Sequence, residues 1–456
     1  MNKKIDKDNK SFCLAPWMSI HTWPDGRTFP CCLWDSEKPI GNINRNSLEE
    51  IWNNDKMKEA RVSMMKGERI DACERCYHLE DTNYGSYRKD INKRHADKMK
   101  YVEHTKEDGT LDDMNLHLWD LRLSNFCNFK CRSCGAGLSS TWFSDTKKLA
   151  TNERLGSIGN SYYNNPHGDK ALITVNDKVS FLDMISPHYD CVDEVYFAGG
   201  EPLMMPEHYT ILDKLIELDR TDVMIRYSTN FSTLKFGKKN VLDYWKIFKN
   251  MQLWISIDGV GEIGEYIRSG YDDKKFEENI NTFKASGIKP PDIGYMITYG
   301  VMNYLHLFDM VIDFIRRDFV DYQKPFYGNK LMHFSPISFP KYYDCMYMPD
   351  AFKKQFYDRL INFHNELVEE GASEFFINDI IPKLGSVYNR SISSKFDYDQ
   401  MLECQVVNEE LDKLRKEKFN EIFSYFPTPE SFTNNTETYK LTEHIYSKIT
   451  IKDSTI

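Results

Sequence analysis

The chain has 456 residues, which is too long for one small core and predicts two or three domains. Its composition is that of a globular protein, and a formal net charge of −10 argues against wholesale nucleic-acid binding. Residues 1–10 are polar and lysine-rich without the apolar region of a signal peptide, and no apolar run is long enough to span a membrane. We therefore expect a cytoplasmic protein in which clustered cysteines, among the eleven present, ligate a metal or a cluster.

The first segment, residues 11–80, combines a predicted hairpin with four spaced cysteines. Residues 18–23 alternate like a strand and residues 24–27 suit a turn, so the returning strand brings Cys31 to the same end as Cys13. Farther on, Cys73 and Cys76 form a C-x2-C pair. Four thiolates can hold one zinc ion or one four-iron cluster, and spacing alone leaves both open.

Two further features belong to this part of the chain. Ser47–Glu50 is a capping box that predicts the start of a helix. Cys32 neighbours Cys31 on a strand and is expected on the opposite side, as a spectator. The stretch 84–114 is rich in charged residues and is expected to be a solvated helix or linker.

From residue 115 the pattern becomes regular, with apolar strand-like runs alternating with helix-period stretches. Six such units predict a parallel α/β sheet and, by their number, a partial (β/α)6 barrel of the TIM type, with chemistry at the carboxyl ends of the strands. After residue 349 the chain is helical and charged, and no motif there predicts chemistry. The predicted strands span residues 117–124, 192–198, 223–229, 253–257, 293–298 and 331–336.

The first of these strands leads directly into a C-x3-C-x2-C run made of Cys127, Cys131 and Cys134. Three thiolates can hold three corners of a four-iron cluster and leave the fourth iron open for a substrate or cosubstrate. Structural zinc sites use four closed ligands, so the count of three favours the cluster.

Polar motifs follow the next strands. Gly199-Gly200-Glu201 would let a ligand approach the backbone, with Glu201 adding a charge-assisted hydrogen bond, although an ordinary glycine turn has the same pattern. Asn230 and Ser256 carry groups suited to sugar hydroxyls, and Arg268 could form a fork onto a carboxylate.

In this order and spacing, the motifs resemble the radical S-adenosylmethionine (SAM) enzymes over about residues 115–337. The resemblance implies that Cys127, Cys131 and Cys134 hold a 4Fe–4S cluster whose open iron binds SAM. It further implies that the methionine amine is held by Gly199, Gly200 and Glu201, the ribose by Ser256 and Asn230, and the methionine carboxylate by Arg268. Ser133 departs from the family, which usually has an aromatic residue at this position near the adenine.

The N-terminal segment resembles the auxiliary-cluster module called SPASM, or twitch in its short form. That resemblance implies a second 4Fe–4S cluster on Cys13, Cys31, Cys73 and Cys76, in a module that normally follows the barrel. We expect an auxiliary domain at 1–83, a linker at 84–114, a radical SAM core at 115–345 and a helical extension at 346–456.

The resemblance predicts an enzyme that cleaves SAM reductively to a 5′-deoxyadenosyl radical and abstracts hydrogen from a C–H bond. Its electron donor would be a protein such as flavodoxin or ferredoxin. The large C-terminal extension favours a peptide or protein substrate. Two alternatives remain: a dehydrogenase of a small sugar or cyclitol-type alcohol, and a zinc-bearing binding protein without redox chemistry.

Overall fold

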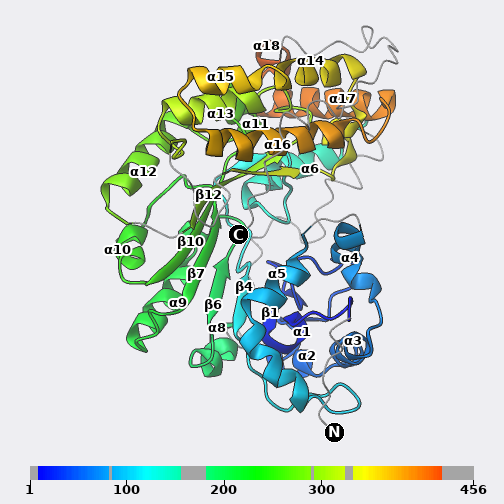
Figure 1. Ribbon diagram of the computed structural model, residues 1–456, viewed down its shortest axis with the longest axis vertical. Coiled ribbons are helices and arrows are strands. Elements are labelled where there is room, and N and C mark those ends of the chain that lie inside the picture. The colour runs from blue at the N-terminus through cyan, green and yellow to red at the C-terminus, as the bar shows by residue number, and fades with distance from the viewer. Residues whose placement is uncertain (1–8, 82–84, 156–180, 289–291, 324–331, 424–456) are drawn as a thin grey trace. The chain divides into compact units, whose positions relative to one another are not determined.

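The computed structural model describes residues 9–81, 85–155, 181–288, 292–323 and 332–423 (Figure 1). The chain divides into two compact units. The first comprises Met1–Cys127, Lys170–Thr229 and Thr233–Gln252, and the second comprises Asn128–Asp169, Asn230–Ser232 and Leu253–Ile456.

The first unit is built on a sheet in the strand order β7-β6-β4-β1-β2-β3. The predicted hairpin is confirmed, since β1 and β2 are antiparallel with His21 opposite Phe29. Strand β1 also pairs in parallel with β4, and the pairs β4–β6 and β6–β7 are parallel too, so the hairpin extends the sheet of the predicted barrel strands. The bounds are β1 (Ser19–Thr22), β2 (Arg27–Phe29), β3 (Gly41–Asn42), β4 (Leu118–Leu121), β6 (Glu194–Phe197) and β7 (Met224–Thr229).

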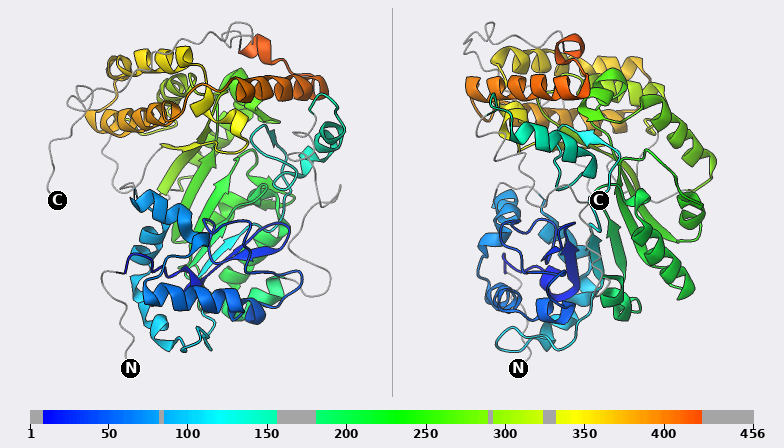
Figure 2. Two further views of the ribbon diagram at one scale, coloured as in Figure 1. Left: turned by 90° about the vertical axis from the view of Figure 1, so that its right-hand side faces the viewer. Right: turned by 180° about the vertical axis from the view of Figure 1, so that it is seen from behind.

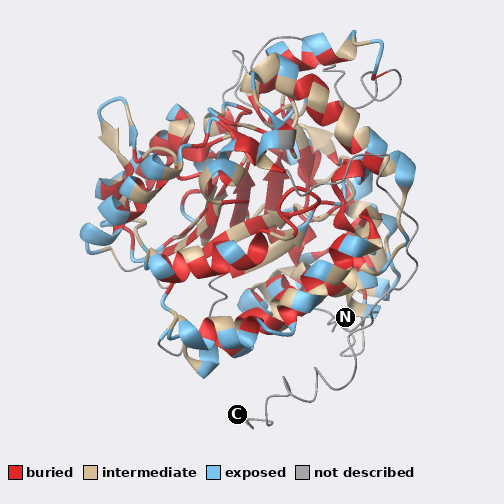
Figure 3. Cartoon of the chain, turned by 90° about the horizontal axis from the view of Figure 1, so that it is seen from above, coloured by how far each residue is buried: buried red, intermediate tan, exposed pale blue. Residues whose placement is uncertain are grey.

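Strands β1 and β4 are buried along their whole length. Figure 3 shows strands in the colour of buried residues and exposed residues along the helices. The predicted capping box is confirmed, because Ser47 Oγ accepts from the Glu50 amide and Glu50 Oε2 accepts from the Ser47 amide. The stretch 84–114 forms one α-helix and a 3-10 helix (Ala96–His104) and buries Arg88 and Ile91, so it is more than a solvated linker. The helices are α1 (Ala15–Met18), α2 (Leu48–Trp52), α3 (Asp55–Lys66), α4 (Glu74–Asp81), α5 (Tyr87–Arg94), α8 (Phe181–Ile185), α9 (Pro206–Glu217) and α10 (Val241–Trp245).

The second unit contains the strand order β13-β12-β10, of which β12 and β13 are parallel, and a separate antiparallel pair, β5–β11. Its C-terminal helices lie near one another, coloured yellow to orange in Figure 2. The bounds are β5 (Lys130–Cys131), β10 (Asn250–Ser256, which begins in the first unit), β11 (Arg268–Ser269), β12 (Asp292–Tyr299), β13 (Met332–Pro336), α6 (Phe143–Ala150), α11 (Gly261–Ile267), α12 (Asp273–Ala285), α13 (Leu307–Arg316), α14 (Asp350–Leu360), α15 (Phe363–Glu369), α16 (Glu374–Ser391), α17 (Tyr398–Arg415) and α18 (Phe419–Ile422).

The predicted fold class is confirmed: the chain is mixed α/β, with parallel strands alternating with helices and a helical C-terminal region. All six predicted barrel strands are present as β4, β6, β7, β10, β12 and β13, although residue 331 of the last predicted strand lies outside the described residues. Within the described ranges, every helix is too short or too polar to cross a bilayer.

Candidate functional site

Four N-terminal cysteines were predicted as ligands, and all four lie in the first unit. Cys13 precedes α1, Cys31 follows β2, Cys73 ends a 3-10 turn and Cys76 lies in α4. The side chains of Cys13, Cys31 and Cys76 are buried, and that of Cys73 is half-buried.

These four thiols act on one another electrostatically. The pKa of Cys13 is raised to about 12, chiefly by burial, and the neighbouring Cys76 thiol contributes to this rise. The pKa of Cys31 is raised by burial and then by its cysteine neighbours, which include Cys13 and Cys73. The pKa of Cys73 is likewise raised by burial, Cys13 and Cys76. The hairpin and the C-x2-C pair therefore lie within electrostatic range of each other.

Four cysteine thiols are the donor set of a 4Fe–4S cluster, so these residues fit such a group by their chemistry. The same four thiols suit zinc equally well as donors. Over the residues described, no group of three or more His, Cys, Asp or Glu side chains is arranged so that it could hold a metal ion.

Helix α5, from the charged stretch, holds the backbone around Cys13. Arg88 Nη1 donates to the Phe12 carbonyl over 2.6 Å, and Asn92 both donates to Phe12 and accepts from the Leu14 amide. Arg88 also lowers the pKa of Cys13 and Cys73 by its charge and is balanced by Glu80. The sequence analysis missed this buried cation, because a charged run gives no sign of which member turns inward.

Cys32, the expected spectator, faces a different group of side chains. Burial raises the pKa of Cys32 to about 12, and the charge of Asp120 adds to the effect. Asp120 lies on β4, and its Oδ2 is 3.1 Å from His21 Nδ1 on β1. Cys32 is therefore placed beside a buried carboxylate.

The C-x3-C-x2-C run is divided between the two units, with Cys127 ending a segment of the first while Cys131 and Cys134 belong to the second. Within the second unit, the pKa of Cys131 is lowered to about 7, chiefly by a hydrogen bond with the Cys134 side chain. The charges of Arg268 and Arg415 also lower this pKa, against the effects of burial and Asp258. These neighbours therefore favour the thiolate of Cys131, the form that binds iron.

Arg268 lies directly opposite Cys131 in the β5–β11 pair. Its Nη1 donates to Asp258 Oδ2 over 3.2 Å, and Asp258 Oδ1 accepts from the Thr298 amide. Burial raises the pKa of Asp258, and Arg268 opposes that rise. The arginine predicted to hold a carboxylate is therefore placed beside a predicted cluster ligand and paired with an aspartate of this chain.

Two predicted ribose contacts also lie in the second unit. Asn230 Nδ2 donates to Asn128 Oδ1 over 3.0 Å, which ties it to the cysteine run. Ser256 ends β10 and is half-buried. Their roles toward SAM stay predictions.

The Gly199-Gly200-Glu201 motif packs against the backbone of residues 124–126 in the first unit. A Cβ on Gly200 would lie 2.1 Å from the Phe126 carbonyl oxygen, so only glycine fits there. Glu201 is fully buried, and its Oε1 accepts from the Leu203 amide and from Thr229 Oγ1. The motif is therefore more than an ordinary turn, because its glycine permits close approach to the loop that leads to Cys127.

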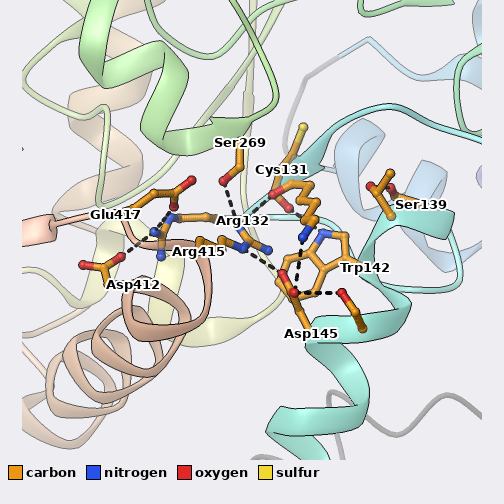
Figure 4. Close-up of polar contacts among 12 residues, drawn as sticks. Cys131, Arg132, Ser139, Trp142, Asp145, Ser269, Asp412, Arg415 and Glu417 are labelled. Carbon is orange, nitrogen blue, oxygen red and sulfur yellow. Dashed lines mark hydrogen bonds and ion pairs between the residues drawn. The ribbon is translucent and has the colours of Figure 1, made fainter.

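The C-terminal helices contact the cysteine run directly, although no chemistry was predicted for them (Figure 4). Arg415, at the end of α17, donates to the Lys130 carbonyl, and the buried Arg132 donates to Asp412 of the same helix. Asp145 of α6 pairs with Arg415. The sequence of this region has no motif that indicates these contacts, because they depend on tertiary structure alone.

Residues 121–315 match the model of the radical SAM superfamily, and residues 13–77 match the model of an iron–sulfur cluster-binding domain named SPASM. No curated protein matches the chain.

Several solved structures are similar in part. Native anSMEcpe with bound AdoMet is 18% identical, with 55% of this chain and 61% of that chain covered and a TM-score of 0.35. Streptococcus suis SuiB bound to S-adenosylmethionine is 14% identical, with coverages of 69% and 64% and a TM-score of 0.34. SuiB bound to the precursor peptide SuiA is 12% identical, with coverages of 70% and 64% and a TM-score of 0.33. The chain spans somewhat over three fifths of the length of these proteins.

The two family matches fall on the two cysteine sets described above, in the order that the motifs predicted. The chain belongs to the radical SAM superfamily: a SPASM domain for auxiliary iron–sulfur binding precedes a radical SAM domain that uses a 4Fe–4S cluster and S-adenosylmethionine.

Proposed function

We propose that this enzyme abstracts a hydrogen atom from a C–H bond of a peptide or protein substrate, with an auxiliary cluster assisting. Cys127, Cys131 and Cys134 ligate the SAM-binding cluster, and Cys13, Cys31, Cys73 and Cys76 ligate the auxiliary one. When bound, the first cluster supplies the electron that cleaves SAM to methionine and a 5′-deoxyadenosyl radical.

The observation that carries the proposal is the pairing of Cys131 with Arg268 across β5 and β11. It sets a thiol with a lowered pKa beside the guanidinium that the family pattern assigns to the methionine carboxylate. A thiolate that favours iron and a cation that favours a carboxylate are the two charges that such a site requires.

Other residues of the chain support the same site by holding its backbone. Gly200 allows the Gly-Gly-Glu motif to approach residues 124–126, and the Glu201 amide donates to the Phe126 carbonyl over 2.6 Å. Glu201 is itself fixed by Thr229. We assign the SAM amine to this motif and the ribose to Asn230 and Ser256.

A peptide substrate is favoured by the C-terminal helical region. Its described residues include five large apolar side chains that are exposed, whereas an enzyme for a small alcohol needs only an enclosed polar pocket. Apolar and aromatic side chains on a surface favour contact with another polypeptide. The five are Ile361, Val368, Phe375, Tyr398 and Leu402.

The test is anaerobic reconstitution followed by reduction with dithionite in the presence of SAM. We expect roughly eight irons per chain, the sum of two four-iron clusters, and formation of 5′-deoxyadenosine. Cys127→Ala should abolish 5′-deoxyadenosine, while Cys191→Ala, at a cysteine outside both sets, should leave it unchanged. Colourless protein that binds zinc would overturn the proposal.

The substrate class is tested separately. Deuterium from a labelled peptide library should enter 5′-deoxyadenosine. If deuterium is transferred only from labelled sugars or cyclitols, the substrate is a small alcohol and not a peptide. A flavodoxin or ferredoxin should support the same turnover in place of dithionite.

A further inference from the structure

Arg415 reaches from the end of α17 to the strand pair that carries Cys131. Its Nη1 donates to the Lys130 carbonyl on β5 and to Ser269 Oγ on β11, each over 2.9 Å. One guanidinium therefore bridges both strands of the pair. Its side chain is only 3% exposed, so this bridge is screened from solvent.

The neighbours of Arg415 extend the contact to the cysteine backbone. The guanidinium lies 4.4 Å from the centre of the Trp142 ring, and Trp142 Nε1 donates to the Cys131 carbonyl over 3.1 Å. Arg415 Nε donates to Asp145 Oδ2 over 2.9 Å. The remaining nitrogen, Nη2, is buried without a hydrogen-bond partner among the described residues, which leaves its two N–H donors unused beside the cysteine run.

A second arginine, which belongs to the cysteine run itself, donates to residues at the end of α17 and just after it. Arg132, between Cys131 and Cys134, is fully buried and lies 3.6 Å from the centre of the Tyr266 ring. It donates to Asp412 over 2.6 Å and to Glu417 over 2.6 Å, so two carboxylates face its single positive charge. The two arginines thus join the cysteine run to the end of α17 at separate points.

The cations on the β5–β11 side of Cys131 are paired differently. Lys130 and Arg415 share the Asp145 carboxylate, while Arg268 pairs with Asp258. Net charge and hydrogen bonds near the sulfurs set the reduction potential of an iron–sulfur cluster. A buried cation stabilises the reduced form, because reduction adds a negative charge.

We propose that Arg415 is a positioning residue that raises the reduction potential of the SAM-binding cluster and holds its cysteine run in place from the C-terminal helix. This inference rests on the proposed ligand role of Cys131. The C-terminal region then contributes to electron uptake as well as to folding.

The test measures the potential of the SAM-binding cluster by EPR-monitored redox titration, in a Cys73→Ala background that removes the auxiliary signal. Arg415→Gln should lower the potential, so that at a fixed potential the reduced fraction relative to the oxidised falls roughly tenfold, the Coulomb effect of a unit charge at about 10 Å and an effective dielectric constant of about 20. Arg415→Lys, which keeps the charge, should shift it less. Asp145→Asn removes the opposing charge and should raise the potential.

The matched control is Arg154→Gln. Arg154 also pairs with α17, through Glu409 and Glu410, but lies outside the contacts of the cysteine run. If Arg415 had a purely structural role, Arg415→Gln and Asp145→Asn would shift the reduction potential in the same direction. That result would overturn the inference, and so would an unchanged potential in both variants. If the Arg415→Gln variant does not bind iron, the inference is tested by Asp145→Asn alone, which should raise the reduction potential. Failure of the proposed function would give a different result. In that case Cys131 would not be a cluster ligand, and adding Cys131→Ala to the Cys73→Ala variant would leave its iron content unchanged.

Discussion

His21 Nδ1 lies 3.1 Å from Asp120 Oδ2, and both side chains are almost completely buried. The two residues are direct partners in the parallel pairing of β1 and β4, although they are about a hundred positions apart. The contact shows that the hairpin of the SPASM domain is continuous with the first strand of the radical SAM domain in one sheet. Cys31, which we propose as a ligand, therefore follows a hairpin whose position is fixed by the sheet.

The first prediction concerns this pair. His21→Phe should destabilise the protein by about 3 kcal/mol, because it leaves the buried Asp120 carboxylate without its imidazole partner. The double variant His21→Phe/Asp120→Leu should recover part of that loss, since it removes the stranded charge as well. Urea unfolding midpoints measure both effects, and the exposed His364→Phe is the control. Equal loss in the single and double variants would contradict the prediction.

The second prediction is a pH dependence that arises from Glu194. Burial by itself raises the pKa of Glu194, but His95, Arg226 and Arg94 outweigh it and lower the pKa to about 2. A lowered pKa means that the stabilising contribution is complete above the unfolded value near 4.5 and is lost as the pH falls toward 2.

The variant Glu194→Gln should therefore be about 3 kcal/mol less stable than the wild type at pH 7. Between pH 5.5 and 3.5 the difference should narrow by about 1 kcal/mol. Urea unfolding at several pH values measures the gap. A gap that stays constant over this range would show that the Glu194 carboxylate keeps the same pKa on unfolding.

The third prediction concerns Gly200. Gly200→Ala would place a methyl group 2.1 Å from the Phe126 carbonyl oxygen and 2.6 Å from its carbon, both backbone atoms with little room to move. We expect the loop before Cys127 to shift and the affinity for SAM to fall at least tenfold, measured by equilibrium dialysis on the reconstituted protein. Gly137→Ala is the matched control, because a Cβ there meets no atom within 4 Å. Equal affinities would mean that the loop tolerates the shift.

Local patterns predicted most of the fold and part of the site. The Ser47–Glu50 capping box, the hairpin around His21 and the alternating strands depend on neighbours in sequence, so periodicity and turn residues reveal them. The hairpin and the C-x2-C spacing also indicated Cys13 and Cys73 as members of one set, and the two thiols act on each other electrostatically.

The remaining features depend on contacts that no local pattern encodes. The Arg415 side chain reaches a carbonyl 285 positions earlier, and nothing in the charged tail distinguishes it from the arginines that stay in solvent. The inward turn of Arg88 and the pairing of Arg268 with Asp258 are of the same kind. The partners of such charged side chains can be identified only once the fold shows which of them are buried.

The last prediction separates the two metal sites and decides between iron and zinc in the first. Cys73→Ala removes one thiol of the N-terminal set, and this thiol interacts electrostatically with both Cys13 and Cys31. We expect this variant to lose roughly four irons per chain, since a four-iron cluster needs its full ligand set. It should still form 5′-deoxyadenosine from SAM, because Cys131 keeps its own neighbours, Cys134 and Arg268. Metal analysis by mass spectrometry gives the first result and chromatography of the reaction gives the second. If the wild-type protein instead carries about four irons and one zinc, and Cys73→Ala loses only the zinc, the N-terminal set is a zinc site, and the auxiliary cluster has no part in the reaction.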